Sequence, residues 1–177
     1  MMDVHRVLVL THVAATLGLF CTLTVEGLAV LFLRRSTTYE QAREWARLWT
    51  LLPAIGAPAI LLSLASGIYL ATQLGLWEFR WTQVAVPTLV IVAIVGGVVA
   101  PRRSRLRSTV GANSGPLPVA IQDEVRHPSL STSWIVRMAL LSGLVVVMVI
   151  KPDRAIGMLT FFALLGLACS APQWRRQ

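Results

Sequence analysis

The sequence predicts an all-α fold: a polytopic membrane bundle of five transmembrane helices, forming a single domain over residues 1–177. Three observations predict it. Hydrophobic residues make up 55% of the chain and charged residues only 14%, whereas a soluble domain carries about 25% charged residues. Five apolar segments follow one another, and basic residues gather on one side of them. This composition excludes a disordered regulator, a disulfide-stapled secreted domain and an ordinary cytosolic enzyme.

The five segments are long enough, or nearly long enough, to cross a bilayer, which takes about 20 apolar residues. The first contains a single charge, Glu26. The second contains Pro53 and Pro58 among many small residues, which permit close helix approach. The third is rich in Val and Ile, but its unbroken length favours a helix over strands. The predicted helices cover about residues 7–33, 48–74, 82–100, 133–150 and 155–171.

Polar connections join these helices. The fourth and fifth segments are joined by a tight turn at residues 151–154, which predicts a helical hairpin. The only long connection is a predicted cytoplasmic loop, 101–132. Its arginines at 102–107 are expected against anionic headgroups, and residues 117–127 are expected to form a short surface helix.

Tryptophans and basic residues indicate how the bundle lies in the membrane. All six tryptophans fall at segment ends, which is typical of an aromatic belt at the headgroups. Twelve of the sixteen basic residues lie in or next to the first and third loops and the C-terminal tail. The positive-inside rule then places the N-terminus outside and the C-terminus inside. We expect a multi-pass protein of the bacterial inner (plasma) membrane, with the bilayer and not nucleic acid explaining its net charge of +8.

The first helix carries the most informative polar residues. His5, His12, Leu19, Glu26 and Leu33 are spaced seven apart, so they share one slowly drifting face. Ionisable residues inside a bilayer are costly and need an explanation. The apolar members of the stripe predict that this face is turned toward other helices.

His12 has three interpretations. It is a buried imidazole bonded to a neighbouring helix, a ligand of haem or a transition metal, or a proton relay. His5 lies about 10 Å further along the axis, too far to share one metal ion, but it could line the same entrance. His127 is predicted on the opposite side of the membrane.

Two further charged groups are candidates for a structural or binding role. Glu26 is predicted to pair with Arg137, at matching depth in the fourth helix, as a structural clasp. The alternatives are a protonated Glu26 or an Arg137 that snorkels to the interface. Charged residues of the outer hairpin are either a solvated turn or a rim that guards a site above His12: Lys151, Asp153 and Arg154.

Short motifs resemble a bacterial integral-membrane family of unknown function that is loosely related to CopD-type copper-resistance and HemJ-type membrane proteins. They are Thr11-His12-Val13, the Pro53-containing second helix with Ser66-Gly67-Ile68-Tyr69-Leu70, the Trp77 loop and Val149-Ile150-Lys151-Pro152-Asp153. In HemJ-type proteins a first-helix histidine is implicated in haem handling. The resemblance implies that His12 is its counterpart and that haem is a possible cofactor.

Three functions remain open from the sequence. The leading one is a non-catalytic scaffold or accessory subunit, whose small-residue faces would contact a second copy or a partner membrane protein. The alternative is a haem- or metal-binding redox protein that uses His12. A small proton-linked transporter is the third, with Glu26 as its carboxylate.

Overall fold

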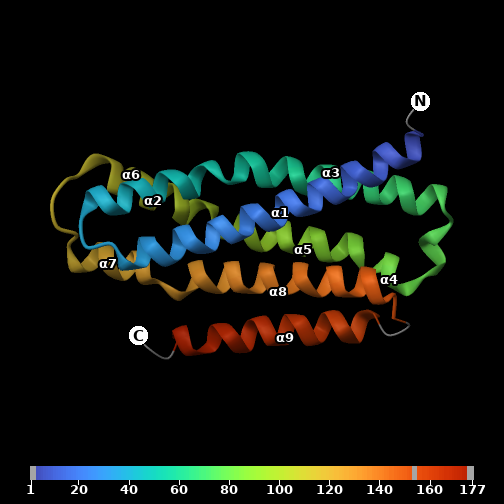
Figure 1. Ribbon diagram of the computed structural model, residues 1–177. Coiled ribbons are helices and arrows are strands. Elements are labelled where there is room, and N and C mark those ends of the chain that lie inside the picture. The colour runs from blue at the N-terminus through green and yellow to red at the C-terminus, as the bar shows by residue number, and fades with distance from the viewer. Residues whose placement is uncertain (1–2, 153–154, 175–177) are drawn as a thin grey trace.

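The computed structural model describes residues 3–152 and 155–174, and these form a helical bundle without a strand (Figure 1). Only one isolated bridge, between Thr38 and Pro116, departs from helix and loop. The elements are α1 (Val4–Arg35), α2 (Tyr39–Leu51), α3 (Pro53–Gln73), η1 (Leu76–Glu78), α4 (Arg80–Gln83), α5 (Ala85–Val98), α6 (Ala100–Ala112), α7 (Val119–Arg126), α8 (Pro128–Ile150) and α9 (Ala155–Trp174). The predicted all-α class is confirmed.

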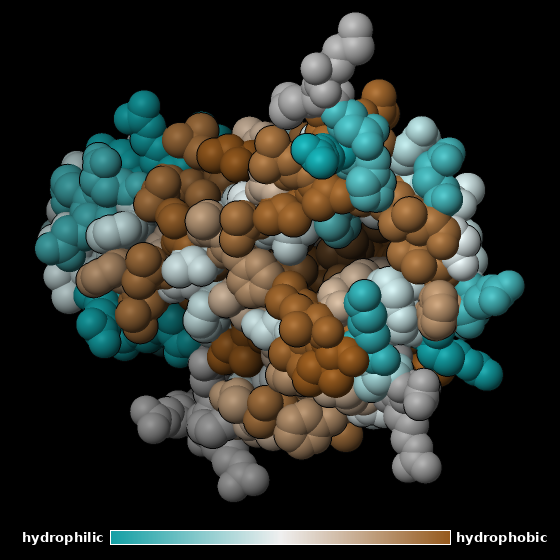
Figure 2. Space-filling view, turned by 45° about the vertical axis from the view of Figure 1, so that its right-hand side comes forward, coloured by the Kyte–Doolittle hydropathy of each residue, from teal (hydrophilic) through white to brown (hydrophobic). Residues whose placement is uncertain are grey.

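In the described part of the chain, four helical stretches are long and apolar enough to cross a membrane. They are Val4–Arg35, Tyr39–Gln73, Arg80–Ala112 and Val119–Ile150, and Ile156–Ala171 forms a shorter apolar helix. Many large apolar side chains on them are exposed. Figure 2 shows them as a broad brown surface with hydrophilic residues gathered toward its ends. Apolar exposure on this scale marks a surface made for lipid or protein contact. Together with the length of the four apolar helices, it indicates a membrane protein.

Helix extends well beyond the predicted spans at one end of the bundle. The second helical stretch begins at Tyr39 rather than at 48, and the predicted loop 101–132 contains α6, α7 and the start of α8. The predicted surface helix is present as α7. Pro53 and Pro101 lie in the first turns of α3 and α6, where a missing N–H breaks no helical bond. The apolar helices α3, α5 and α8 therefore each adjoin a more polar helix, α2, α6 and α7 respectively, across a single residue.

These added helices have a core of their own at what we call the arginine-rich end: α2, α6, α7 and the adjoining ends of α1 and α8 (Figure 1, left). On α2, Ala42, Ala46 and Trp49 share one face and are almost fully buried. They pack with Leu106 and Val110 of α6 in one hydrophobic cluster. The apolar stripe on each helix explains why polar segments fold here instead of forming a loop.

The opposite end, which we call the amino-terminal end, holds the start of α1, η1, α4 and the C-terminal end of α8. α9 lies along α8, at the edge of the bundle (Figure 1). Two glycines permit this close approach, since a Cβ at Gly143 would meet the Phe162 ring and one at Gly166 would meet Ala139.

Two tryptophans contradict the predicted aromatic belt. Trp49 is 1% exposed and lies inside the arginine-rich end. Trp134 lies against Gly27, and its Nε1 donates to the carbonyl of Leu23 at 2.7 Å. Both indoles satisfy their single donor inside the protein, so each one joins two helices.

Candidate functional site

The stripe of residues spaced seven apart on α1 faces the interior from His12 onward, as predicted, whereas its first member, His5, is exposed. Leu19, Glu26 and Leu33 are each at most 3% exposed, and His12 is partly buried. At a rise of 1.5 Å per residue, His12 and Glu26 are about 21 Å apart along the axis. The stripe therefore defines two separate places, one toward each end of the bundle.

Glu26 contacts Arg137, as expected from the sequence. The two nitrogens Nη1 and Nη2 of Arg137 donate to Oε2 and Oε1 of Glu26 at 3.0 and 2.6 Å. Its Nε donates to the carbonyl of Ser133, one turn earlier in α8, at 3.1 Å. A bidentate pair of this kind fixes the relative orientation of the guanidinium and carboxylate planes, and it is stronger than a single hydrogen bond.

A second arginine and an indole complete this group, and the sequence reasoning missed both. Arg103 donates from Nη2 to Oε1 of Glu26 at 2.6 Å, and Trp49 donates from Nε1 to the same oxygen at 3.2 Å. The Arg103 guanidinium lies 4.5 Å from the centre of the Trp49 ring. We call Glu26, Trp49, Arg103 and Arg137 the Glu26 cluster.

Arg103 was expected at the lipid headgroups and is instead 7% exposed inside the bundle. The signal that could have found it is the spacing of Leu106 and Val110, which follow it at three and seven residues and share its face of α6. Its neighbours Arg102 and Arg105 lie off this buried stripe. A prediction from charge alone was therefore wrong for Arg103.

His12 is anchored to α3 by one ring nitrogen. Nδ1 lies 3.0 Å from the carbonyl oxygen of Ser63 and 3.2 Å from Oγ of Ser66. A carbonyl only accepts, so Nδ1 carries the hydrogen, and in the neutral ring Nε2 is then a bare acceptor. A Cβ at Gly67 would lie 3.0 Å from Cε1 of the ring. Glycine at this position leaves the space that the imidazole occupies.

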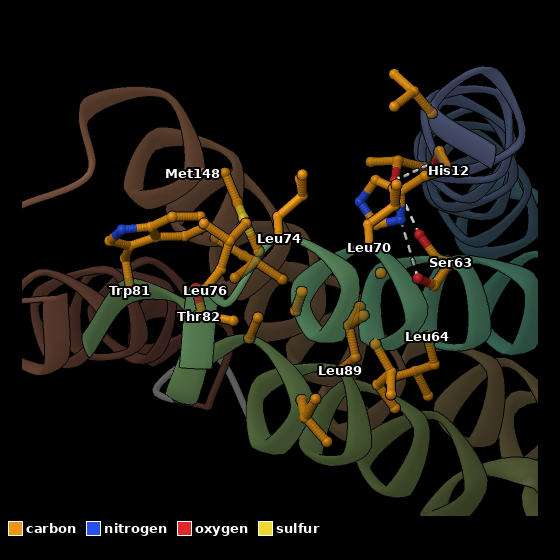
Figure 3. Close-up of a pocket in the computed structure, with 18 of the residues that line it drawn as sticks. His12, Ser63, Leu64, Leu70, Leu74, Leu76, Trp81, Thr82, Leu89 and Met148 are labelled. Carbon is orange, nitrogen blue, oxygen red and sulfur yellow. Dashed lines mark hydrogen bonds between the residues drawn. The ribbon is translucent and has the colours of Figure 1, made fainter. Parts of the chain in front are cut away.

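Beside the ring is a cavity of about 260 Å³ that we call the His12 cavity. Helices α1, α3, α5 and α8 and the α4 turn supply its mostly apolar walls, and His5 lies among the lining residues, as the sequence suggested. In Figure 3 one hydrogen bond runs from a ring nitrogen of His12 to Ser63, and the other nitrogen lies on the side of the cavity. No described residue makes a hydrogen bond to Nε2.

The predicted outer rim is described only at Lys151. This residue ends α8 with a positive φ of 52°, and its Nζ lies 5.5 Å from the centre of the Trp81 ring. Trp81 itself lines the His12 cavity, so Lys151 makes a cation–π contact with a residue of the cavity wall. Asp153 and Arg154 lie outside the described residues.

His127 is far from His12, as predicted, because it caps the start of α8 at the arginine-rich end. Among the described residues no group of three or more His, Cys, Asp or Glu side chains could hold a metal ion. The chain matches no protein-family model, no curated protein and no solved structure. The family resemblance given above therefore stays a prediction.

Proposed function

We propose that this protein is a non-catalytic integral-membrane protein that holds a small, mainly apolar ligand in the His12 cavity. One observation carries the proposal. The Ser63 carbonyl accepts a hydrogen bond from Nδ1 of His12, so the lone pair of Nε2 is left on the side of an apolar cavity. Nε2 has no donor among the described residues, and an acceptor that makes no hydrogen bond in apolar surroundings is costly. A ligand that brings one O–H or N–H group to Nε2 removes that cost.

The cavity's size and lining support the same ligand class. Binding sites for small molecules are typically apolar with a few polar groups that fix orientation, and they measure about 300–1,000 Å³. At about 260 Å³, the His12 cavity suits one aromatic ring system or one end of a longer molecule. Thr16 of α1 also lines the cavity, and its hydroxyl is already hydrogen-bonded to the Ser63 hydroxyl at 2.8 Å.

The test compares two probes that differ in one donor, 2-naphthol and 2-methoxynaphthalene, on the purified protein in detergent. We expect the naphthol to bind about two- to twelvefold more tightly, the equivalent of a net hydrogen bond of about 0.5–1.5 kcal/mol. His12→Asn should abolish this preference, because its amide N–H can still donate to Ser63, while its carbonyl oxygen does not reach the position of Nε2. His5→Asn is the matched control, on the same helix and cavity. A preference that survives in His12→Asn would reject the proposal.

Haem ligation through Nε2 is a second candidate, favoured by one specific contact. Histidines that ligate metals commonly donate their other N–H to a backbone carbonyl, as His12 does to Ser63. Titration with haemin should then give a Soret band that His12→Asn removes and His5→Asn retains. A spectrum of free haemin at every ratio would exclude this candidate and leave the naphthol result unaffected.

A further inference from the structure

A second cavity, of about 280 Å³, lies beside the Glu26 cluster between α1, α3, α5 and α8. Glu26, Arg103 and Arg137 form its polar wall. The rest is apolar or small, and the lining residues Ala57 of α3 and Gly97 of α5 are exposed. The cavity is therefore polar inside and open between α3 and α5. We call it the Glu26 cavity.

The charges of the Glu26 cluster do not balance. One carboxylate faces two guanidiniums, and Glu26 is the only acidic partner of Arg103 and Arg137 among the described residues. Both arginine side chains are 8% exposed. A surplus positive charge buried among apolar helices is costly unless an anion neutralises it.

Hydrogen-bond donors are also in excess. Each guanidinium has five N–H donors. Arg137 bonds to Glu26 and Ser133, and Arg103 bonds to Glu26 and, at 3.5 Å, to the Trp49 carbonyl. Nε of Arg103 is buried without any hydrogen-bond partner in the described part of the chain. The two guanidiniums of the polar wall thus carry more charge and more donors than the carboxylate of Glu26 uses.

We propose that the Glu26 cavity binds an anionic amphiphile. Its oxyanion pairs with Arg103 and Arg137, and its acyl chain leaves between α3 and α5. Guanidinium groups match the geometry of carboxylate and phosphate oxygens. The open side, at Ala57 and Gly97, presents no charge to an acyl chain. This site is separate from the His12 cavity, and neither proposal depends on the other.

Equilibrium binding to the purified full chain in a non-ionic detergent tests the proposal with three probes. Dodecanoate combines the oxyanion with a chain, dodecanol has the chain alone, and inorganic phosphate has the oxyanion alone. We expect dodecanoate to bind at least tenfold more tightly than either of the others. Binding of dodecanol as tight as that of dodecanoate would show nonspecific hydrophobic binding. Binding of phosphate as tight as that of dodecanoate would show a site for free anions. Either result overturns the proposal.

Variants then locate the site. Arg103→Gln should weaken dodecanoate binding at least tenfold, because it removes the surplus charge and leaves Glu26 paired with Arg137. Arg102→Gln is the matched control: the neighbouring side chain bonds to Ser129 and does not line the cavity. Unchanged dodecanoate binding in Arg103→Gln, or no dodecanoate binding to the wild-type protein, would show that the cluster is a clasp only.

A variant of the open side keeps the proposal testable if Arg103→Gln does not fold. A Cβ at Gly97 would meet nothing within 4 Å, so Gly97→Leu can be accommodated at the backbone while its side chain fills the opening. It leaves all members of the Glu26 cluster in place. We expect at least a tenfold loss of dodecanoate binding, and an unchanged affinity would place the acyl chain elsewhere and reject the site.

Discussion

Glu26 and His12 are two polar residues of the α1 stripe, and they are stabilised inside the apolar bundle in different ways. Glu26 is charged and draws donors from three other segments, α2, α6 and α8. His12 is held by α3 alone, and its second nitrogen is left beside a cavity. A buried charge needs several partners because its desolvation is expensive, whereas a neutral ring needs only one hydrogen bond to be oriented. The first place ties helices together, and the second leaves room for a ligand.

The largest effect should come from removing the carboxylate. We expect Glu26→Gln to lower the free energy of unfolding by about 3–5 kcal/mol, since two guanidiniums then stay buried without a counter-charge. Unfolding by SDS from a non-ionic detergent, followed by circular dichroism, measures it. Glu44→Gln is the control, because Glu44 is exposed on α2. Equal midpoints for the two variants would contradict a stabilising role for the cluster.

The two arginines should differ from each other. Hydrogen bonds to charged groups contribute about 1.5–3 kcal/mol each. Arg137→Gln removes two such bonds to Glu26 and Arg103→Gln removes one, so Arg137→Gln should lower the unfolding free energy by roughly twice as much. The double variant measures their coupling through the shared carboxylate. If Arg103→Gln proves the more damaging, then Arg103 and not Arg137 is the main partner of Glu26.

The smallest effect on stability is expected from a substitution of His12. His12→Asn should change the unfolding free energy by about 1 kcal/mol or less, because the amide can keep the bond to Ser63 and no charge is left unpaired. The same SDS titration measures it against Glu26→Gln. A loss as large as that of Glu26→Gln would remove the contrast between the two places, and with it the argument that His12 is free to serve a ligand.

The sequence predicted part of the surroundings of Glu26 and of His12. The spacing of Glu26 and Leu33 identified the buried face of α1, and matching depth identified Arg137 as a partner. Arg103 was misplaced because its neighbours in the run are polar and its own apolar register, with Leu106 and Val110, is confined to a short helix. Ser63 is one of the many small residues of the second segment and Gly67 belongs to the Ser66–Leu70 motif, but their contact with the His12 ring depends on the packing of α3 on α1.

The chain by itself determined the helical class, the apolar helices and the inward stripe of α1, because these follow from composition and from the fixed period of one helix. Only the tertiary structure decided which groups meet at that stripe. The partners of Glu26 come from positions 23, 77 and 111 residues away, and Ser63 lies 51 residues from His12. Such pairs depend on how helices pack and turn against one another, and no local periodicity records that.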